Sequence, residues 1–280
     1  MAPLGLGSGF YGVGPTLSAG ESVHVSAVDG QYMAVPTGAN GLNLNNAFQS
    51  TIRGSFTFAT YFFASGKGAG PQLTSTFFGS RTTENAPTHT DEVRFGIDND
   101  GKIAFFMDVK NGGSKALDQT STSAPFASVV TGWNHIAIAV TNNGPTTTNI
   151  STLVVYINGS SHGMTLASVS QITGTEHNTY TSTRDIILGN LGIDEVPQGN
   201  NRMLLMKHSA LWNSTLNASS ITEINDAGIN TPLDLTSASG NYNQQGSLVG
   251  YWKLTEGSGT TATDETGNNN GTIILNASLI

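Results

Sequence analysis

Hydrophobic residues in this chain alternate with small and polar residues in short runs, and turn-forming residues separate the runs. In the segment 55–63, Phe56 and Phe58 lie on one face of an extended chain, while Tyr61 and Phe63 lie on the other. A strand with apolar side chains on both faces has to be covered on both faces. This segment therefore predicts a central strand of a sheet.

Three pairs of such runs flank residues that favour tight turns. An Asn or Asp followed by Gly can adopt the positive φ angles of the turns that join antiparallel strands. The sequence therefore predicts three β-hairpins, over 23–35, 93–107 and 152–164, with turns at Asp29-Gly30, Asp98-Asn99-Asp100-Gly101 and Asn158-Gly159. Further strands are predicted around Phe77-Phe78 and over 133–141, 186–188 and 203–212.

One segment carries the signals of a helix. Ser220 and Glu223 have the spacing of a capping box, in which each side chain accepts a hydrogen bond from the other residue's backbone N–H. Gly228 follows at the position where a helix commonly ends. We predict a short helix over 220–227, with Ser220 as its N-cap.

The composition agrees with an all-β class. The 280 residues include 34 glycines and only 11% are charged, which is typical of many short strands joined by turns. A chain of this length can form one β-sandwich. We therefore expect a single all-β domain.

Charge and cysteine usage exclude several partners. The 19 acidic and 11 basic residues give a formal net charge of -8, which repels phosphate backbones, so we expect no nucleic acid partner. We also expect no secretory leader and no membrane partner, because no run of residues has the required apolar length. The absence of cysteine excludes disulfides and thiolate metal sites, and it suits synthesis in a reducing cytoplasm.

Five segments follow one another in a characteristic order: 28–32 reads VDGQY, 54–59 reads GSFTFA, 132–137 reads GWNHIA, 153–159 reads LVVYING, and 206–213 reads MKHSALWN ahead of a helix over 216–225. This succession resembles the laminin G-like members of the concanavalin A-like lectin/glucanase superfamily. The resemblance implies an antiparallel β-sandwich of jelly-roll type, and it identifies a fold rather than an activity. We expect an extended N-terminal arm over 1–20, the sandwich over 21–230 and a C-terminal extension of short strands over 231–280 that packs on the sandwich.

The two chain ends suggest a biological setting. The opening segment reads MAPLGLGSG, and 231–272 runs from TPLDLT through GYWK to GNNNGT. These ends are similar in style to structural proteins of tailed marine bacteriophages. The resemblance implies a non-enzymatic virion subunit of a head decoration, tail or fibre, made in the host cytoplasm. The alternatives are a carbohydrate-binding module for a cell-surface glycan and, third, a glycoside hydrolase.

The predicted arm combines glycines with apolar side chains at low charge. Alone it cannot bury enough apolar surface to fold, so we expect it to pack on another copy of the chain or on another virion protein. Its apolar side chains are Leu4, Leu6, Phe10, Tyr11, Val13 and Leu17.

Catalytic chemistry is not predicted. Glycan cleavage needs two carboxylates on one face, with the sugar between them. Adjacent side chains of an extended chain point to opposite faces, so we interpret the acidic pairs as solvated turns and expect no catalytic residue. The pairs are Asp91-Glu92, Asp194-Glu195 and Asp264-Glu265.

Metal binding is not predicted either. Calcium-binding relatives carry an Ile-Asp-Asp/Glu-Val strand, and the matching residues here are Met206-Lys207-His208-Ser209. A cation in place of a carboxylate removes an oxygen ligand, so we expect no metal and no cofactor at this strand, while an ion site elsewhere stays open. In a regular strand His208 shares a face with Met206, Ala210 and Trp212, so we interpret it as a hydrogen-bonded packing residue.

Three tryptophans, Trp133, Trp212 and Trp252, are available to stack on a sugar ring. Each lies within a predicted strand, which favours packing in the core over a sugar platform.

Overall fold

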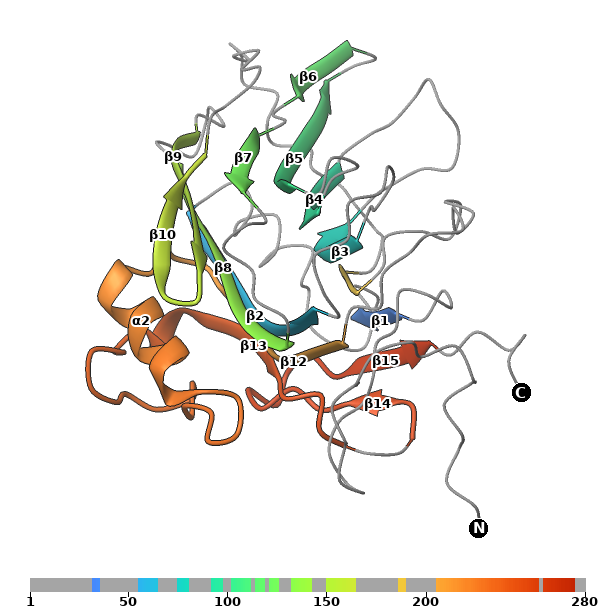
Figure 1. The fold of residues 1–280 in the computed structure, drawn as a ribbon. Coiled ribbons are helices and arrows are strands. Elements are labelled where there is room, and N and C mark those ends of the chain that lie inside the picture. Colours follow the sequence, from blue (N-terminus) through green and yellow to red (C-terminus); the bar gives the residue numbers. More distant parts are fainter. Residues whose placement is uncertain are drawn as a thin grey trace.

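The chain folds into two antiparallel β-sheets that pack face to face (Figure 1). The structure is a computed structural model, and it describes residues 32–35, 55–64, 75–80, 92–97, 102–111, 114–118, 121–125, 132–142, 150–164, 186–189, 205–256 and 259–274. Within these ranges, one α-helix accompanies the strands. The predicted all-β class and antiparallel β-sandwich are confirmed.

In the described residues, sheet A has nine strands in the order β14-β15-β1-β11-β3-β4-β5-β6, with β7 paired to β5. Its strands are β1 (Tyr32–Val35), β3 (Ser75–Ser80), β4 (Glu92–Ile97), β5 (Lys102–Asn111), β6 (Ser114–Asp118), β7 (Ser121–Pro125), β11 (Ile186–Leu188), β14 (Thr261–Ala262) and β15 (Gly271–Ile274). Sheet B has six strands in the order β10-β9-β8-β2-β12-β13. They are β2 (Phe56–Ala64), β8 (Gly132–Asn142), β9 (Ile150–Ile157), β10 (Ser160–Gly163), β12 (Leu205–Trp212) and β13 (Leu248–Trp252).

Apolar side chains from both sheets fill the space between them. Phe58 of β2 stacks on Phe78 of β3 with ring centroids 4.9 Å apart. Phe62 of β2 lies 4.9 Å from the ring of Phe77 on β3. All four rings are buried, so removing their apolar area from water is a main source of cohesion between the sheets.

The outer face of sheet B is also buried, and small side chains line it. We name four buried alanines on this face the alanine floor: Ala59, Ala137, Ala139 and Ala210. Ala59 pairs with Ala137 on one side and with Ala210 on the other, so the floor is continuous across three strands. Helix α2 (Ala218–Ala227) lies on the side of sheet B opposite to sheet A (Figure 1). Its buried Ile221 and Ile224 belong to the same hydrophobic cluster as the floor.

The helix belongs to the connection between β12 and β13, residues 213–247, which we name the cover. Its N-terminal side is tied to the sheet by threonine hydroxyls. The Leu216 N–H donates to Thr57 Oγ1 at 2.9 Å, and Thr215 Oγ1 donates to the Val140 carbonyl at 2.9 Å. These hydrogen bonds place α2 over the middle of the sheet.

Three local predictions are confirmed. The segment 55–63 forms β2, which pairs with β8 and β12 and is buried on both faces. Strands β4 and β5 pair as the predicted hairpin over 93–107 requires. Strands β9 and β10 pair around Asn158 and Gly159, whose φ values of 49° and 78° are those of the predicted turn.

The first predicted hairpin is wrong. Strand β1 pairs with β11 along one edge and with β15 along the other. No edge of 32–35 is therefore left for a hairpin partner from 23–28. The partners of β1 lie more than a hundred residues away in the chain, beyond the reach of a local turn signal.

The predicted capping box is also wrong. Helix α2 begins at Ala218, and its N-cap is Asn217, whose side chain accepts a hydrogen bond from the Ser220 N–H at 2.8 Å. Ser220 instead lies buried in the first turn, where its hydroxyl donates to the Asn241 carbonyl at 2.9 Å. Gly228, with φ 78°, follows the helix as predicted.

The C-terminal part of the chain contributes to both sheets. Strand β13 lies beside β12 in sheet B, and β14 and β15 extend sheet A beyond β1. The boundaries at residues 20 and 230 stay predictions, and the arm over 1–20 lies outside the described residues. Within the described ranges, no helix combines the length and the apolar character needed to cross a membrane.

Ala59→Leu should lower the free energy of unfolding by about 1–3 kcal/mol, because a larger side chain on the alanine floor collides with α2. Urea denaturation followed by circular dichroism measures the change. Ala238→Leu, at an exposed position of the cover, should leave the stability nearly unchanged. Equal stabilities of the two variants would show that α2 does not press on the floor.

Candidate functional site

Two of the three tryptophans are core residues. Trp212 and Trp252 are buried. Trp212 Nε1 donates to the Tyr242 hydroxyl at 3.0 Å, and Trp252 Nε1 donates to the Asn269 carbonyl at 2.7 Å. Because each indole N–H is satisfied inside the protein, these residues pack as the sequence predicts and do not offer sugar platforms.

Trp133 differs from the other two, and its predicted place in the core is wrong. It is partly exposed on the outer face of sheet B, where its ring meets the Phe63 ring edge-on at a centroid distance of 5.7 Å. The Lys207 ammonium lies 5.5 Å from the centroid of the Trp133 ring. We name Phe63, Trp133 and Lys207 the aromatic patch. It joins β2, β8 and β12, because Trp133 is the cross-strand partner of Phe63.

Lys207 lies on this face because its neighbour Met206 points into the core between the sheets, and a β-bulge follows Lys207 in β12. Lys207 lies opposite Tyr61 and Ala210 lies opposite Ala59, so His208 and an adjacent serine together face one residue of β2. The bulge changes the alternation of the strand: Met206 belongs to the core between the sheets, whereas Ala210 belongs to the alanine floor. The prediction that His208 shares one face with Met206, Ala210 and Trp212 is therefore wrong.

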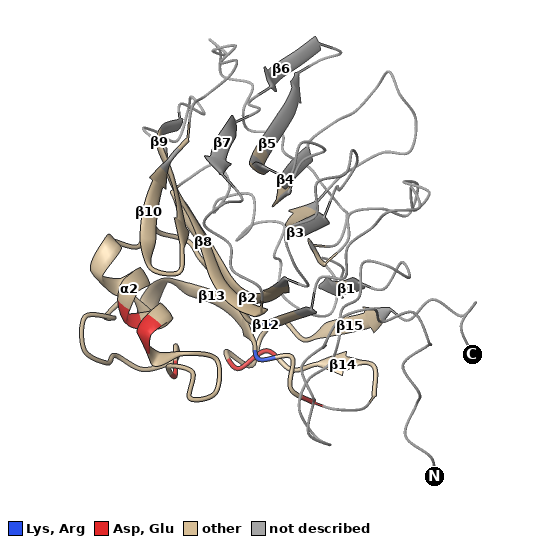
Figure 2. Ribbon diagram, in the orientation of Figure 1, with Lys and Arg blue, Asp and Glu red and all other residues tan. Residues whose placement is uncertain are grey.

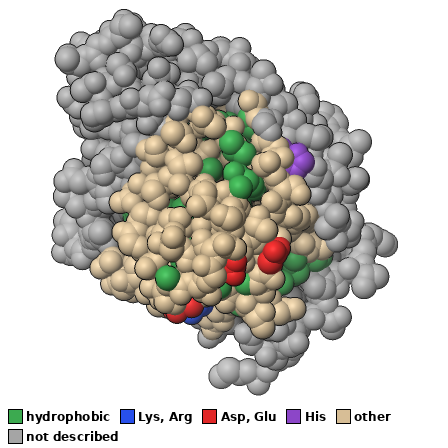
Figure 3. All heavy atoms as spheres, turned by 90° about the vertical axis from the view of Figure 1, so that its left-hand side faces the viewer, with side chains coloured by type: hydrophobic (Ala, Val, Ile, Leu, Met, Phe, Trp, Pro, Cys, Tyr) green, Lys and Arg blue, Asp and Glu red, His purple; other side chains and the backbone are tan. Residues whose placement is uncertain are grey.

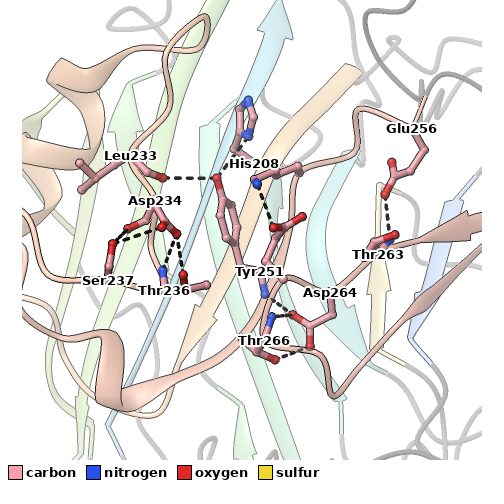
Figure 4. A network of polar contacts seen from close by, with 12 residues as sticks. His208, Leu233, Asp234, Thr236, Ser237, Tyr251, Glu256, Thr263, Asp264 and Thr266 are labelled. Carbon is pink, nitrogen blue, oxygen red and sulfur yellow. Dashed lines mark hydrogen bonds and ion pairs between the residues drawn. The ribbon is translucent and has the colours of Figure 1, made fainter.

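Four rings form a row across the outer face of sheet B, beneath the C-terminal end of α2. We name them the ring row: His135, Tyr61, His208 and Tyr251. Their neighbouring centroids are 4.9, 6.1 and 6.4 Å apart. The Tyr61 hydroxyl donates to the Ile224 carbonyl at 2.7 Å, and the Tyr251 hydroxyl lies 3.4 Å from both the Leu233 carbonyl and His208 Nδ1 (Figure 4). The row therefore fastens the cover to the sheet.

Burial keeps the ring row uncharged at neutral pH. Burial lowers the pKa of His135 to about 4, and both of its buried ring nitrogens lack a hydrogen-bond partner in the described structure. Burial and then the positive charge of Lys207 lower the pKa of His208 to about 4. Burial also raises the pKa of Tyr61 to about 12. His208 is thus a packing residue, as the sequence predicts.

Asp264 organises the loop that precedes β15. It is only 2% exposed, and its carboxylate accepts hydrogen bonds from the Tyr251 and Asn269 N–H groups, both at 2.8 Å. Glu265 lies on the surface instead and pairs with Lys253 at 2.8 Å. The two acids point apart as predicted, but the interpretation of Asp264 as a solvated turn residue is wrong.

The same loop covers the outer edge of β13. The Tyr251 carbonyl accepts a hydrogen bond from the Glu265 N–H at 2.8 Å, and the Val249 carbonyl accepts one from Asn269 Nδ2 at 2.8 Å. We name residues 264–270 the Asp264 loop. It connects the edge of sheet B to the strands that extend sheet A.

Charge is sparse on the described surface. Figure 2 shows acidic residues on α2 and near the junction of β13 and β14. Figure 3, which views the molecule from the side of the cover, shows mainly uncharged polar atoms and backbone, with hydrophobic side chains gathered in places.

Several residues named from the sequence lie outside the described side chains. They are the six apolar residues of the arm, the pairs Asp91-Glu92 and Asp194-Glu195, and the turn residues Asp98 and Asp100. Within the described part of the chain, no group of three or more His, Cys, Asp or Glu side chains is arranged to hold a metal ion.

The residues that sequence reasoning missed are His135, Tyr61 and Tyr251. Each was visible as an aromatic residue in a predicted strand, but nothing local signals that four strands bring the rings into one row.

Comparison with known proteins yields structural likenesses only. No family model and no curated protein matches the chain. A candidate carbohydrate-binding protein from Bacteroides ovatus aligns with a TM-score of 0.48 and 16% identity, over 90% of this chain and 58% of that one. The CBM40 of the Ruminococcus gnavus IT-sialidase aligns with a TM-score of 0.41 and 12% identity, over 73% of this chain and 96% of that one. At such identities and TM-scores, these likenesses assign no function.

Asp264→Ala should lower the free energy of unfolding by about 2–4 kcal/mol, because it leaves several buried N–H groups without an acceptor. Glu265→Ala removes an ion pair whose side chains are 38% and 32% exposed, so its effect should stay below about 1 kcal/mol. Chemical denaturation of both variants tests the difference. If Glu265→Ala costs as much as Asp264→Ala, the buried carboxylate does not organise the loop.

Proposed function

We propose that this chain is a non-catalytic carbohydrate-binding β-sandwich, with the aromatic patch as its sugar-binding surface. The observation that carries the proposal is the position of Trp133. It is the tryptophan that the sheet holds partly exposed, against Phe63, while the other two are buried with satisfied N–H groups. An aromatic ring fixed by a neighbouring ring suits stacking on the apolar face of a sugar.

Lys207 adds a charged donor to this surface. Its ammonium lies beside the Trp133 ring. Among the described residues Lys207 forms no ion pair, whereas Lys253 pairs with Glu265. The charge of Lys207 is therefore available to a carboxylate or sulfate group of a ligand. This favours glycans that carry such groups beside a ring that can stack.

Three of the described acids are held in contacts within the protein, which supports a role without hydrolysis. Asp264 is buried and saturated with hydrogen bonds, and Glu265 is paired with Lys253. Glu256 accepts a hydrogen bond from the Thr263 N–H at 2.8 Å (Figure 4). We therefore propose that glycans are bound and released unchanged, because two poised carboxylates are needed to cleave them.

Trp133→Ala should lower the affinity for a bound glycan at least about tenfold, since the stacking surface is lost. Binding partners are found on a glycan array and measured by isothermal titration calorimetry. Thr152→Ala, an exposed residue of β9, serves as the matched control and should bind as the parent does. Lys207→Met should weaken the binding of acidic glycans more than that of neutral ones. Equal affinities of the parent and Trp133→Ala would exclude the patch.

Incubation with the glycans that bind should release no reducing ends above buffer. Release that persists in a purified sample and disappears on substitution of Asp194 or Glu195 by Ala would show a hydrolase instead.

A second candidate is an assembly subunit of a bacteriophage virion, favoured by the chain-end resemblance and by the apolar residues of the predicted arm. In this case the partners are other virion proteins or further copies of the chain, and the location is the virion. Deleting residues 1–20 should abolish oligomer formation or attachment to particles, while thermal unfolding of the sandwich stays unchanged. Normal assembly of the truncated protein, measured by co-sedimentation, would contradict an assembly role for the arm.

A further inference from the structure

The cover is held at its two ends by different chemistry. On the N-terminal side of α2, the contacts are hydrogen bonds of Thr57 and Thr215, whose hydroxyls do not titrate near neutral pH. On the C-terminal side, the ring row holds the cover, and two of its four rings are histidines. A change of pH therefore acts on one end of the cover and not on the other.

Neutral imidazoles fit the ring row, and imidazolium ions do not. His135 is 2% exposed, and neither ring nitrogen has an acceptor nearby to receive a second N–H. A charge at this position would be buried without a partner, which is costly unless water reaches it. His208 follows Lys207 in the sequence, and its backbone N–H donates to the Lys253 carbonyl. Protonation of the His208 ring therefore adds a third positive charge beside those of Lys207 and Lys253.

The two tyrosines of the row titrate as well. Other charged and titratable groups face the row from the elements packed against it: Lys207, Lys253, Asp226, Asp234, Glu265 and Tyr242. The acids among them are engaged. Asp234 accepts hydrogen bonds from Thr236 and Ser237, and Glu265 pairs with Lys253. The carbonyls at the end of α2 favour a cation, and a backbone hydrogen bond at Ile229 raises the pKa of His208, but burial outweighs both.

The cover can move without dismantling the sandwich. It is the connection between β12 and β13, so neither strand has to leave sheet B when the cover moves. Its apolar contacts belong to the cluster on the alanine floor, which is separate from the core between the sheets. The two regions therefore need not open together.

We propose that the cover is an acid-released flap: acidification lifts the C-terminal end of α2 off the alanine floor, while the threonine contacts keep its N-terminal end attached. The direction follows from proton uptake. The closed state binds fewer protons than the open state between pH about 6.5 and about 4, so opening is favoured as the pH falls through this range. Each histidine that the opening exposes shifts the opening equilibrium at least about tenfold between pH 7 and pH 4.5. This inference does not depend on the proposed glycan binding.

Hydrogen exchange of the full chain, detected by mass spectrometry, tests the order of opening. Protection factors corrected for intrinsic rates should fall at least tenfold for peptides within 218–235 at pH about 4.5. Peptides from β2 and β8 should keep their protection at the same pH. Simultaneous loss of protection in both regions, or a fully protected α2 at pH 4.5, would overturn the proposal.

A disulfide between α2 and the β9–β10 turn provides a control in which the oxidised and reduced forms of one variant are compared. A Cβ built on Gly159 lies 3.8 Å from the Cβ of Asn225, the separation found in disulfides, and the chain contains no cysteine. Oxidised Gly159→Cys/Asn225→Cys should keep α2 protected at pH 4.5, and the reduced form should open as the parent does. The positive φ of 78° at Gly159 strains a cysteine, so the reduced form also controls for that cost. Equal exchange of the two forms in acid would contradict the flap.

The histidines themselves can be replaced. His135→Phe keeps a ring of similar shape without a charge, and His208→Asn suits the φ of 52° at the bulge. The double variant should stay closed at pH 4.5, whereas His162→Asn on β10 should open like the parent. Opening of the double variant at the parental pH would show that other groups release the cover.

Discussion

Sheet B is apolar on both faces, and this constraint shapes the rest of the molecule. Its inner face carries large aromatic side chains, which a second sheet buries. Its outer face carries alanines, whose small side chains let another element pack close to the sheet. Helix α2 meets that need only because β12 and β13 are neighbours whose connection crosses the floor. The protein is therefore a sandwich with a third layer over the middle of one sheet.

The sequence predicted what depends on neighbouring residues. The turn at Asn158-Gly159 and the strand around Phe58 follow from turn chemistry and alternation, and both are present. The partners of β1 could not be predicted, because they come from distant strands with no local signal. The local pattern of a capping box predicts Ser220 as the N-cap, but Ser220 is buried inside the cover, where its hydroxyl donates to the Asn241 carbonyl.

The candidate site was predicted less well, and a single extra residue is the main reason. Regular alternation along β12 places His208 with Met206, whereas the bulge separates them and brings His208 to the outer face beside Tyr61. A bulge of this kind leaves little trace in a pattern of hydrophobic residues. The position of His208 in the buried ring row depends on this bulge, and the aromatic patch lies next to that row on the outer face of sheet B.

The Asp264 loop has a consequence for the behaviour of the folded chain in concentrated solution. An outermost strand with free backbone groups acts as a template on which a strand of another molecule can grow, and β13 is such a strand by position. The loop occupies the N–H and carbonyl of Tyr251 and the carbonyl of Val249, so these groups offer nothing to an incoming strand. By holding this loop against β13, the buried Asp264 carboxylate also blocks polymerisation by strand addition at this edge of sheet B.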